Sequence, residues 1–212
     1  MSGDSAAPVS AARNTAAPGS ATRWSLRDLM LVVVLGVVFG FLYWGLVQGW
    51  IALSALAGPF GDLVQHVLLG GWLLVAPLAI AIVRRPFAGV VSEVIASVIE
   101  VVFLGSAVGP TLLIAAAIQG AGSELPFAAG RYRSYGWVRY MLSGALGAGA
   151  VFFYSAFRSG WYGTDLFWTR FVIQVLSGAI VGGLLAKVLV LAIARTGAVD
   201  NFAIGRDTAA AR

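Results

Sequence analysis

The sequence predicts an all-α membrane protein with six transmembrane helices. Of its 212 residues, 59% are hydrophobic and 11% are charged, and the mean hydropathy is +0.89. A soluble domain carries roughly 25% charged residues, so most of this chain cannot face water. The apolar residues form long segments, and the polar residues are gathered mainly between them.

A helix that crosses a bilayer needs about 20 mostly apolar residues. Six segments have this length or nearly so: Asp28–Trp50, Gln65–Val83, Ala88–Gly105, Gly109–Ala128, Trp137–Phe157 and Thr169–Ala194. The breaks between them contain residues that end or start helices, such as Gly58-Pro59, Pro86, Gly109-Pro110 and Gly160.

The arginines predict the orientation. Most of them lie in the N-terminal region, the second and fourth breaks and the C-terminal region, while the opposite side carries only Arg158 and Arg170. The positive-inside rule therefore places both termini in the cytoplasm of a multi-pass plasma-membrane protein.

The chain divides into one membrane domain and two tails. Residues 1–22 are rich in Ala, Ser, Pro and Gly, a composition that cannot bury a core. We expect a disordered cytoplasmic tail at 1–22, the six-helix domain at 23–200 and a cytoplasmic C-terminal tail at 201–212.

Several functional classes are excluded by missing residues. The chain has no cysteine and one histidine, so we expect no Cys- or His-rich metal site and no cofactor. It has no G-x-x-x-x-G-K-[ST] run, so it does not hydrolyse ATP by a P-loop mechanism. The basic residues follow the membrane pattern rather than one stripe, which indicates lipid and not nucleic acid as the surroundings.

Ionisable residues inside spanning helices are functional candidates because a carboxylate is costly there. Glu93 and Glu100 lie seven residues apart in the third segment, and Gln119 and Glu124 lie in the fourth. Glu93 and Glu124 are interpreted first as structural residues with polar or arginine partners. Glu100, towards the outer side, is an equally good candidate for binding substrate.

Aromatic residues and small-residue pairs each have two interpretations. The outer side is rich in Trp and Tyr, which is typical of an interfacial belt but also suits stacking on a flat or cationic heterocycle. Gly36-x-x-x-Gly40 predicts close helix packing, first within the bundle and alternatively against another subunit.

A set of motifs along residues 24–206 resembles one known family. They are Gly36-x-x-x-Gly40 followed by Tyr43, Gly70-x-Trp72, Arg84-Arg85-Pro86 before Ser92-Glu93 and Glu100, Val108-Gly109-Pro110, Gln119-Gly120-x-Gly122-x-Glu124, and Ser177-Gly178-Ala179. In order and spacing they are similar to the YkoE family, substrate-binding S components of energy-coupling factor (ECF) transporters.

The resemblance implies a non-enzymatic subunit that captures thiamine or its hydroxymethylpyrimidine (HMP) precursor from outside. It also implies partners: a transmembrane coupling protein (T component) and ABC ATPase subunits that drive uptake. The substrate site implied in the outer half contains Glu100, Trp44, Gln48, Trp72, Gln119, Tyr154 and Trp168. The docking residues implied for the coupling protein are Gly36 and Gly40.

Other interpretations remain open. The nearest is an S component for another vitamin, and the next is a structural or sensory membrane protein whose polar residues only tie helices together. An intramembrane enzyme is less favoured because no nucleophile and base stand at a useful spacing. A secondary transporter is less favoured because the halves show no inverted repeat.

Overall fold

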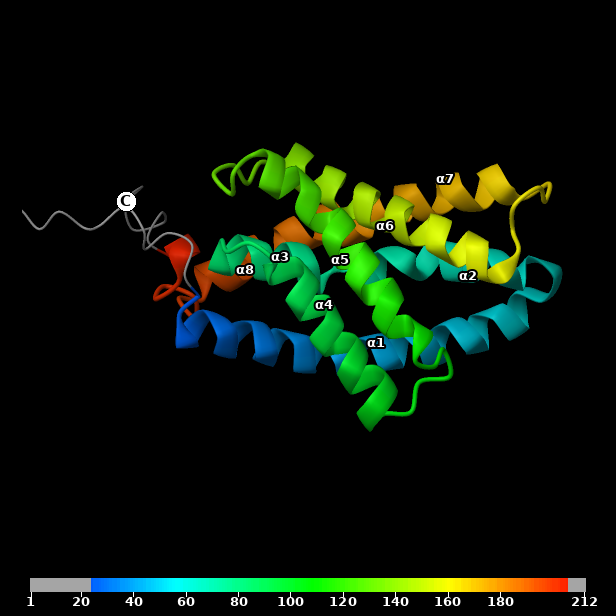
Figure 1. The fold of residues 1–212 in the computed structure, drawn as a ribbon, viewed down its shortest axis with the longest axis horizontal. Coiled ribbons are helices and arrows are strands. Elements are labelled where there is room, and N and C mark those ends of the chain that lie inside the picture. The colour runs from blue at the N-terminus through cyan, green and yellow to red at the C-terminus, as the bar shows by residue number, and fades with distance from the viewer. Residues whose placement is uncertain (1–23, 206–212) are drawn as a thin grey trace, which may run out of the picture.

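In the computed structural model, which describes residues 24–205, the chain is a bundle of helices with no strand in the described part. The bundle is elongated, and the described chain begins and ends at the same end of it (Figure 1). The turns after α3 and α5 also lie at this end, which we call the termini end. The turns after α1 and α6 lie at the other end, which we call the distal end.

Helix α1 (Leu26–Ala57) begins at a capping box, in which the Ser25 side chain accepts from the Asp28 backbone N–H and the Asp28 side chain accepts from that of Ser25. It continues beyond the predicted end at Trp50, because residues 51–57 are good helix formers. Gly58, with φ +54°, ends it. The short 3₁₀ turn η1 (Gly58–Phe60) then reverses the chain.

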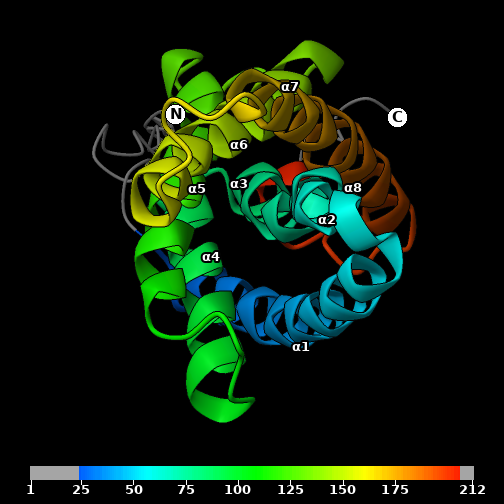
Figure 2. The same cartoon turned by 90° about the vertical axis from the view of Figure 1, so that its right-hand side faces the viewer.

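The returning chain is the centre of the fold. It consists of α2 (Gly61–Leu68), the 3₁₀ segment η2 (Leu69–Leu73) and α3 (Val75–Val83). Every residue of α3 is buried, and in an end-on view the other helices surround it (Figure 2). A helix that is apolar on all faces is expected in such a position.

The next pair of helices forms one wall. Helix α4 (Ala88–Val98) passes directly into the π-helical turn η3 (Ile99–Phe103), and after a loop α5 (Thr111–Ala129) runs back towards the termini end. Glu124 of α5 accepts from the backbone N–H of Val90 at 3.3 Å and from the Tyr132 hydroxyl at 3.0 Å. Burial and the Glu124 carboxylate raise the pKa of Tyr132 above its usual value, so this hydroxyl remains a donor.

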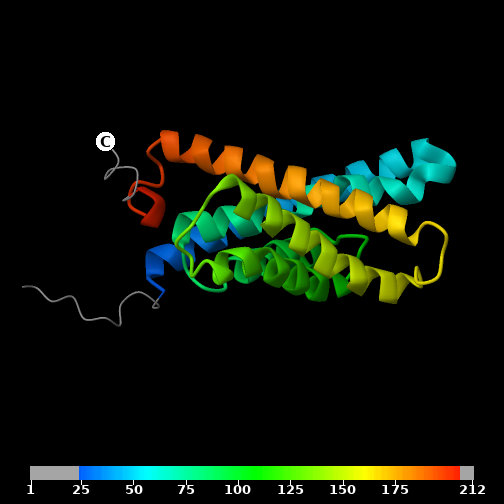
Figure 3. The same cartoon turned by 90° about the horizontal axis from the view of Figure 1, so that it is seen from above.

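The last pair begins with α6 (Trp137–Ser159). It is followed by α7 (Phe167–Ser177), the π-helical segment η4 (Gly178–Leu185) and α8 (Ala186–Arg195), which follow one another in a continuous helical run (Figure 3). Gly144 of α6 faces Gly178, and a Cβ at Gly178 would collide with the carbonyl oxygen of Gly144. Such backbone-to-backbone crossings require glycine.

The helices identify a membrane protein. Four helical stretches of the described chain are long and apolar enough to cross a bilayer: Leu26–Val83, Thr111–Ala129, Trp137–Ser159 and Phe167–Arg195. The first of them, of 58 residues, contains the reversal at η1. The predicted tail at 1–22 and the C-terminal tail beyond Gly205 lie outside the described residues.

Candidate ligand-binding cavity

A cavity of about 400 Å³ lies near the distal end of the bundle, between α1, α2, η2, α5, α6 and α7 and the loops beside them. Its volume is within the range of sites for small organic ligands. Its lining is Trp50, Ile51, Gln65, Leu69, Trp72, Ala107, Val108, Thr111, Leu112, Ala115, Gln119, Val151, Tyr154, Ser155, Arg158, Ser159, Trp161 and Gln174.

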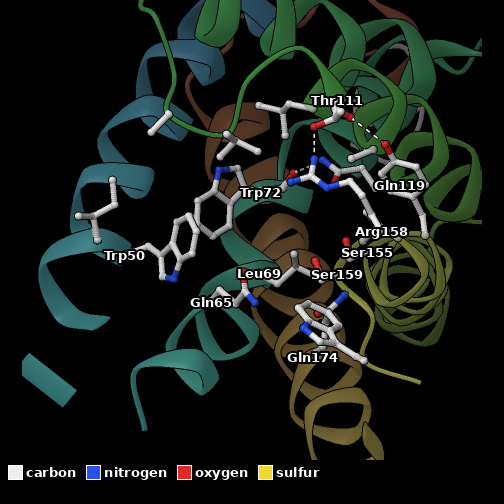
Figure 4. A pocket seen from close by; sticks show the side chains of 18 residues that line it. Trp50, Gln65, Leu69, Trp72, Thr111, Gln119, Ser155, Arg158, Ser159 and Gln174 are labelled. Atoms are coloured by element: carbon white, nitrogen blue, oxygen red, sulfur yellow. Dashed lines mark hydrogen bonds between the residues drawn. The ribbon is translucent and has the colours of Figure 1, made fainter. Parts of the chain in front are cut away.

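The lining combines flat rings with amides. Three tryptophans, Trp50, Trp72 and Trp161, come from different segments, and the amides of Gln65, Gln119 and Gln174 come from three more positions around the cavity (Figure 4). Tryptophan stacks on flat rings. A glutamine amide both donates and accepts hydrogen bonds. Together they can hold a planar heterocycle and recognise its edge.

Gln119 is fixed by its neighbours. Its Nε2 donates to the carbonyl oxygen of Trp72 at 2.9 Å and to Oε2 of Glu93 at 2.8 Å. Glu93 lies outside the lining, and its Oε1 accepts from the Tyr43 hydroxyl at 3.5 Å. That hydroxyl accepts from the backbone N–H of Val75 at 3.1 Å. A buried network thus ties one cavity wall to α1, α3 and α4.

Gln174 is fixed in a similar way on the opposite helix. Its Nε2 donates to the carbonyl oxygen of Ala148 at 2.9 Å, and its Oε1 lies 2.6 Å from Nδ1 of His66. The His66 ring is buried and packs edge-on against Trp161 with centroids 5.0 Å apart. His66 therefore supports two lining residues without lining the cavity itself.

The distal rim of the cavity is polar. Arg158, in the last turn of α6, donates to the Thr111 hydroxyl at the start of α5. The Tyr154 hydroxyl donates to the carbonyl oxygen of Thr111 at 3.4 Å.

Ala107 and Val108 come from the loop between η3 and α5. The Ser106 hydroxyl of that loop donates to Oε1 of Glu100 at 2.8 Å.

The predicted substrate residues fall into two groups. Trp72, Gln119 and Tyr154 line the cavity together. Glu100, Trp44, Gln48 and Trp168 are outside its lining. Glu100 is buried against Ser106, whereas the other three are exposed on the surface of the bundle, Trp168 at 67%.

Sequence reasoning did not select Arg158, Trp161, Trp50, Gln65 or Gln174 for the site, although all five line the cavity. Trp50 and Trp161 have the positions expected of an interfacial belt. Arg158 bears on the sequence analysis only through the orientation that the arginines predict. Gln65 and Gln174 could have been selected because a polar amide in an apolar helix is costly and therefore indicates a functional role.

Gly36 and Gly40 are buried against α4. A Cβ at Gly40 would lie 2.7 Å from Cβ of Ile99 and 2.8 Å from the carbonyl oxygen of Ala96, and one at Gly36 would lie 2.5 Å from Cγ2 of Ile95. This is the packing within the bundle that small-residue pairs commonly provide. The face of α1 that carries these glycines is covered by the chain itself.

Within residues 24–205, no group of three or more His, Cys, Asp or Glu side chains could hold a metal ion. The polar groups that the cavity offers are amides, hydroxyls and one guanidinium. Such groups bind and orient an organic molecule.

Comparisons with known proteins agree with this architecture. Residues 27–151 match a family described as the permease component of an ABC-type cobalt transport system. A protein of Bacillus subtilis named as an HMP/thiamine permease protein, YkoE, is 32% identical over 186 residues, which cover 87% of this chain and 92% of the relative. A solved structure described as an S component of an ECF transporter superposes with a TM-score of 0.83 at 30% identity, covering 90% of this chain and 95% of the other.

Both the sequence and the fold are therefore shared over nearly the full length with substrate-binding transport subunits, which are not enzymes. The chain belongs to the YkoE family of S components, the substrate-binding subunits of ECF transporters.

Proposed function

We propose that this S component captures HMP or thiamine from the outer side of the plasma membrane and that the cavity is the binding site. The observation that carries the proposal is the meeting of three tryptophan rings and three glutamine amides in one cavity of about 400 Å³. Trp72, Gln119 and Tyr154 are its predicted members, and Trp50, Gln65, Trp161 and Gln174 complete it. The name of the B. subtilis relative supports the choice of ligand.

The chemistry of the ligand suits this lining. HMP is a flat aminopyrimidine, and thiamine carries the same ring. The ring nitrogens accept hydrogen bonds and the amino group donates them, so each can pair with a glutamine amide. The tryptophans supply stacking faces. Buried partners fix Gln119 and Gln174 in advance, which lowers the entropic cost of binding.

The proposed topology has six transmembrane helices with both termini in the cytoplasm. The arginine distribution supports it, because Arg84, Arg85, Arg131 and Arg133 lie in the turns of the termini end. The cavity then opens towards the outside of the cell, where the vitamin is captured.

Uptake against a gradient requires energy that this chain has no motif to extract from ATP. We therefore include in the proposal a T component and ABC ATPase subunits as partners. Because α4 covers Gly36 and Gly40, docking by those glycines would require α1 and α4 to separate.

Tryptophan fluorescence of the detergent-purified chain tests the proposal directly. Titration with HMP or thiamine is expected to change the emission saturably, because three of the seven tryptophans line the cavity. Trp161→Phe should reduce the change, whereas Trp168→Phe, which removes an exposed ring outside the cavity, should leave it intact. No saturable change with either compound, in protein that remains monodisperse, would refute the proposed ligand.

A further inference from the structure

The charge of the cavity indicates which ligands it selects, an inference that rests on the proposed function. Of the residues that line the cavity, Arg158 alone carries a formal charge, and no aspartate or glutamate is among them. Figure 4 places its side chain among the lining residues, close to Thr111 in the view, with a hydrogen bond to that residue. The cavity therefore presents a cation to whatever enters it.

Three carboxylates of the described chain are engaged by other partners. Glu93 Oε2 accepts from Gln119, and Glu100 Oε1 accepts from Ser106. At the distal surface, Asp62 pairs with Arg170 at 2.6 Å. Within residues 24–205, no carboxylate forms an ion pair with Arg158, so its charge is not cancelled by a direct contact.

The C-terminal end of α6 stabilises the positive charge of Arg158 at the rim of the cavity. Arg158 lies in the last turn of α6, where the free carbonyl groups give the helix end a partial negative charge. Thr111 accepts from the guanidinium through its hydroxyl, without neutralising it. The arginine is thus held in place while it remains positively charged.

We infer that this cavity selects the uncharged aminopyrimidine and disfavours the same ring when a cationic ring is attached to it. Like charges in a binding site raise the free energy of the complex and discriminate against the wrong ligand. The glutamine amides and the tryptophans recognise a neutral ring without needing a charge. HMP is neutral, whereas the thiazolium ring of thiamine carries a positive charge.

The sharpest test compares thiamine with 3-deazathiamine, in which a carbon atom replaces the thiazolium nitrogen and the ring is uncharged. The two molecules share one shape, so a difference in affinity reports the charge. In the wild-type chain we expect 3-deazathiamine to bind on the order of tenfold more tightly than thiamine, by calorimetry or fluorescence at moderate ionic strength. HMP should likewise bind more tightly than thiamine.

Two variants assign the effect to Arg158. Arg158→Gln removes the charge at similar length and should bring the affinities of thiamine and 3-deazathiamine within about twofold of each other. Arg158→Lys keeps the charge and should preserve the preference. Arg158 is exposed, so both variants should fold, which size-exclusion chromatography checks.

Equal or tighter binding of thiamine by the wild type would overturn the inference while leaving the proposed function intact. A preference that persists in Arg158→Gln would also overturn it. Failure of HMP, thiamine and 3-deazathiamine all to bind would instead refute the proposed function, and the inference with it.

Discussion

Glu93 is the residue through which one wall of the cavity is held in place. It is 1% exposed, accepts from Gln119 and Tyr43, and does not line the cavity itself. Without its carboxylate, the Gln119 amide and the Tyr43 hydroxyl would each lose a partner in the interior. A buried polar group without a partner costs about 1–3 kcal/mol.

We therefore predict that Glu93→Leu lowers the unfolding free energy by about 2–4 kcal/mol, since two buried groups are affected. Glu93→Gln retains an acceptor for Gln119 and should cost about half as much or less. Thermal unfolding in one detergent, followed by circular dichroism, compares them. Equal stability of Glu93→Leu and the wild type would show that this network does not stabilise the fold.

For single residues, the sequence predicted which polar side chains are buried better than it predicted which of them face the cavity. Glu93, Glu100 and Gln119 were all singled out, and all three are buried. Which of them would face the cavity depends on the rotation of each helix. The π-helical turn η3, which contains Glu100, changes that rotation because such a turn contains more residues than an α-helical one. The exposed Trp44 and Trp168 are tryptophans on the predicted outer side, as the lining tryptophans are, so sequence alone could not separate the two groups.

The contact of α1 with α4 is a feature of whole helices, set by two glycines. Gly36 and Gly40 let α1 approach the Ile95 side chain of α4 and the Ile99 side chain of η3, while Gly45 on the same helix has no atom within 4 Å of the position of a Cβ. This difference provides a matched pair of substitutions within one helix.

We predict that Gly40→Ala destabilises the protein by about 1–3 kcal/mol, because the helices must separate or Ile99 must move. Gly45→Ala should be neutral or stabilise by up to about 1 kcal/mol, since alanine favours the helix and meets no neighbour. Thermal unfolding of the purified variants measures both. Equal effects of the two substitutions would contradict the packing described for α1.

The loop between η3 and α5 covers part of the cavity and is attached to η3 by Ser106. Its hydroxyl donates to Glu100, and its backbone N–H donates to the Glu100 carbonyl oxygen at 3.0 Å. Ala107 and Val108, next along the loop, line the cavity.

We predict that Ser106→Ala accelerates ligand dissociation several-fold, because the loop loses its side-chain bond to Glu100 and opens more often. Stopped-flow fluorescence after dilution of the complex measures the rate. Thr111→Ser is the control, since it keeps a hydroxyl at the other end of the loop. An unchanged dissociation rate in Ser106→Ala would show that this bond does not control access.

Among the elements, helix existence was predictable and helix detail was not. The six apolar segments each correspond to helical structure along the chain. The extension of α1 to Ala57 and the π-helical segments η3 and η4 were not predicted. The hydropathy of a segment does not record whether its hydrogen bonds run to the fourth or the fifth residue, which tertiary packing decides.

The two ends of the whole molecule differ in arginine content and in the presence of the cavity. The termini end carries the arginine-rich turns, and the distal end carries the cavity. The topology proposed above makes the distal end extracellular. The fold class could be read from composition and periodicity, whereas the cavity depends on contacts among segments far apart in sequence.

Because the natural chain has no cysteine, single cysteines can report its orientation without background. We predict that Asp165→Cys, in the distal α6–α7 loop, reacts with a membrane-impermeant maleimide in intact cells. Arg133→Cys, in the α5–α6 loop of the termini end, should react only after the cells are opened. Both positions are exposed, so the reverse labelling pattern would contradict the proposed orientation.

The central claim is that the cavity is the ligand site, and the most direct measurement is the affinity for HMP of two variants that remove the same amide. Gln65 lines the cavity, whereas Gln48 is exposed outside it. By isothermal titration calorimetry, Gln65→Leu should weaken HMP binding about tenfold, the loss of one or two hydrogen bonds, and Gln48→Leu should bind as the wild type does. Unchanged binding in Gln65→Leu, or an equal loss in Gln48→Leu, would contradict the assignment of the site.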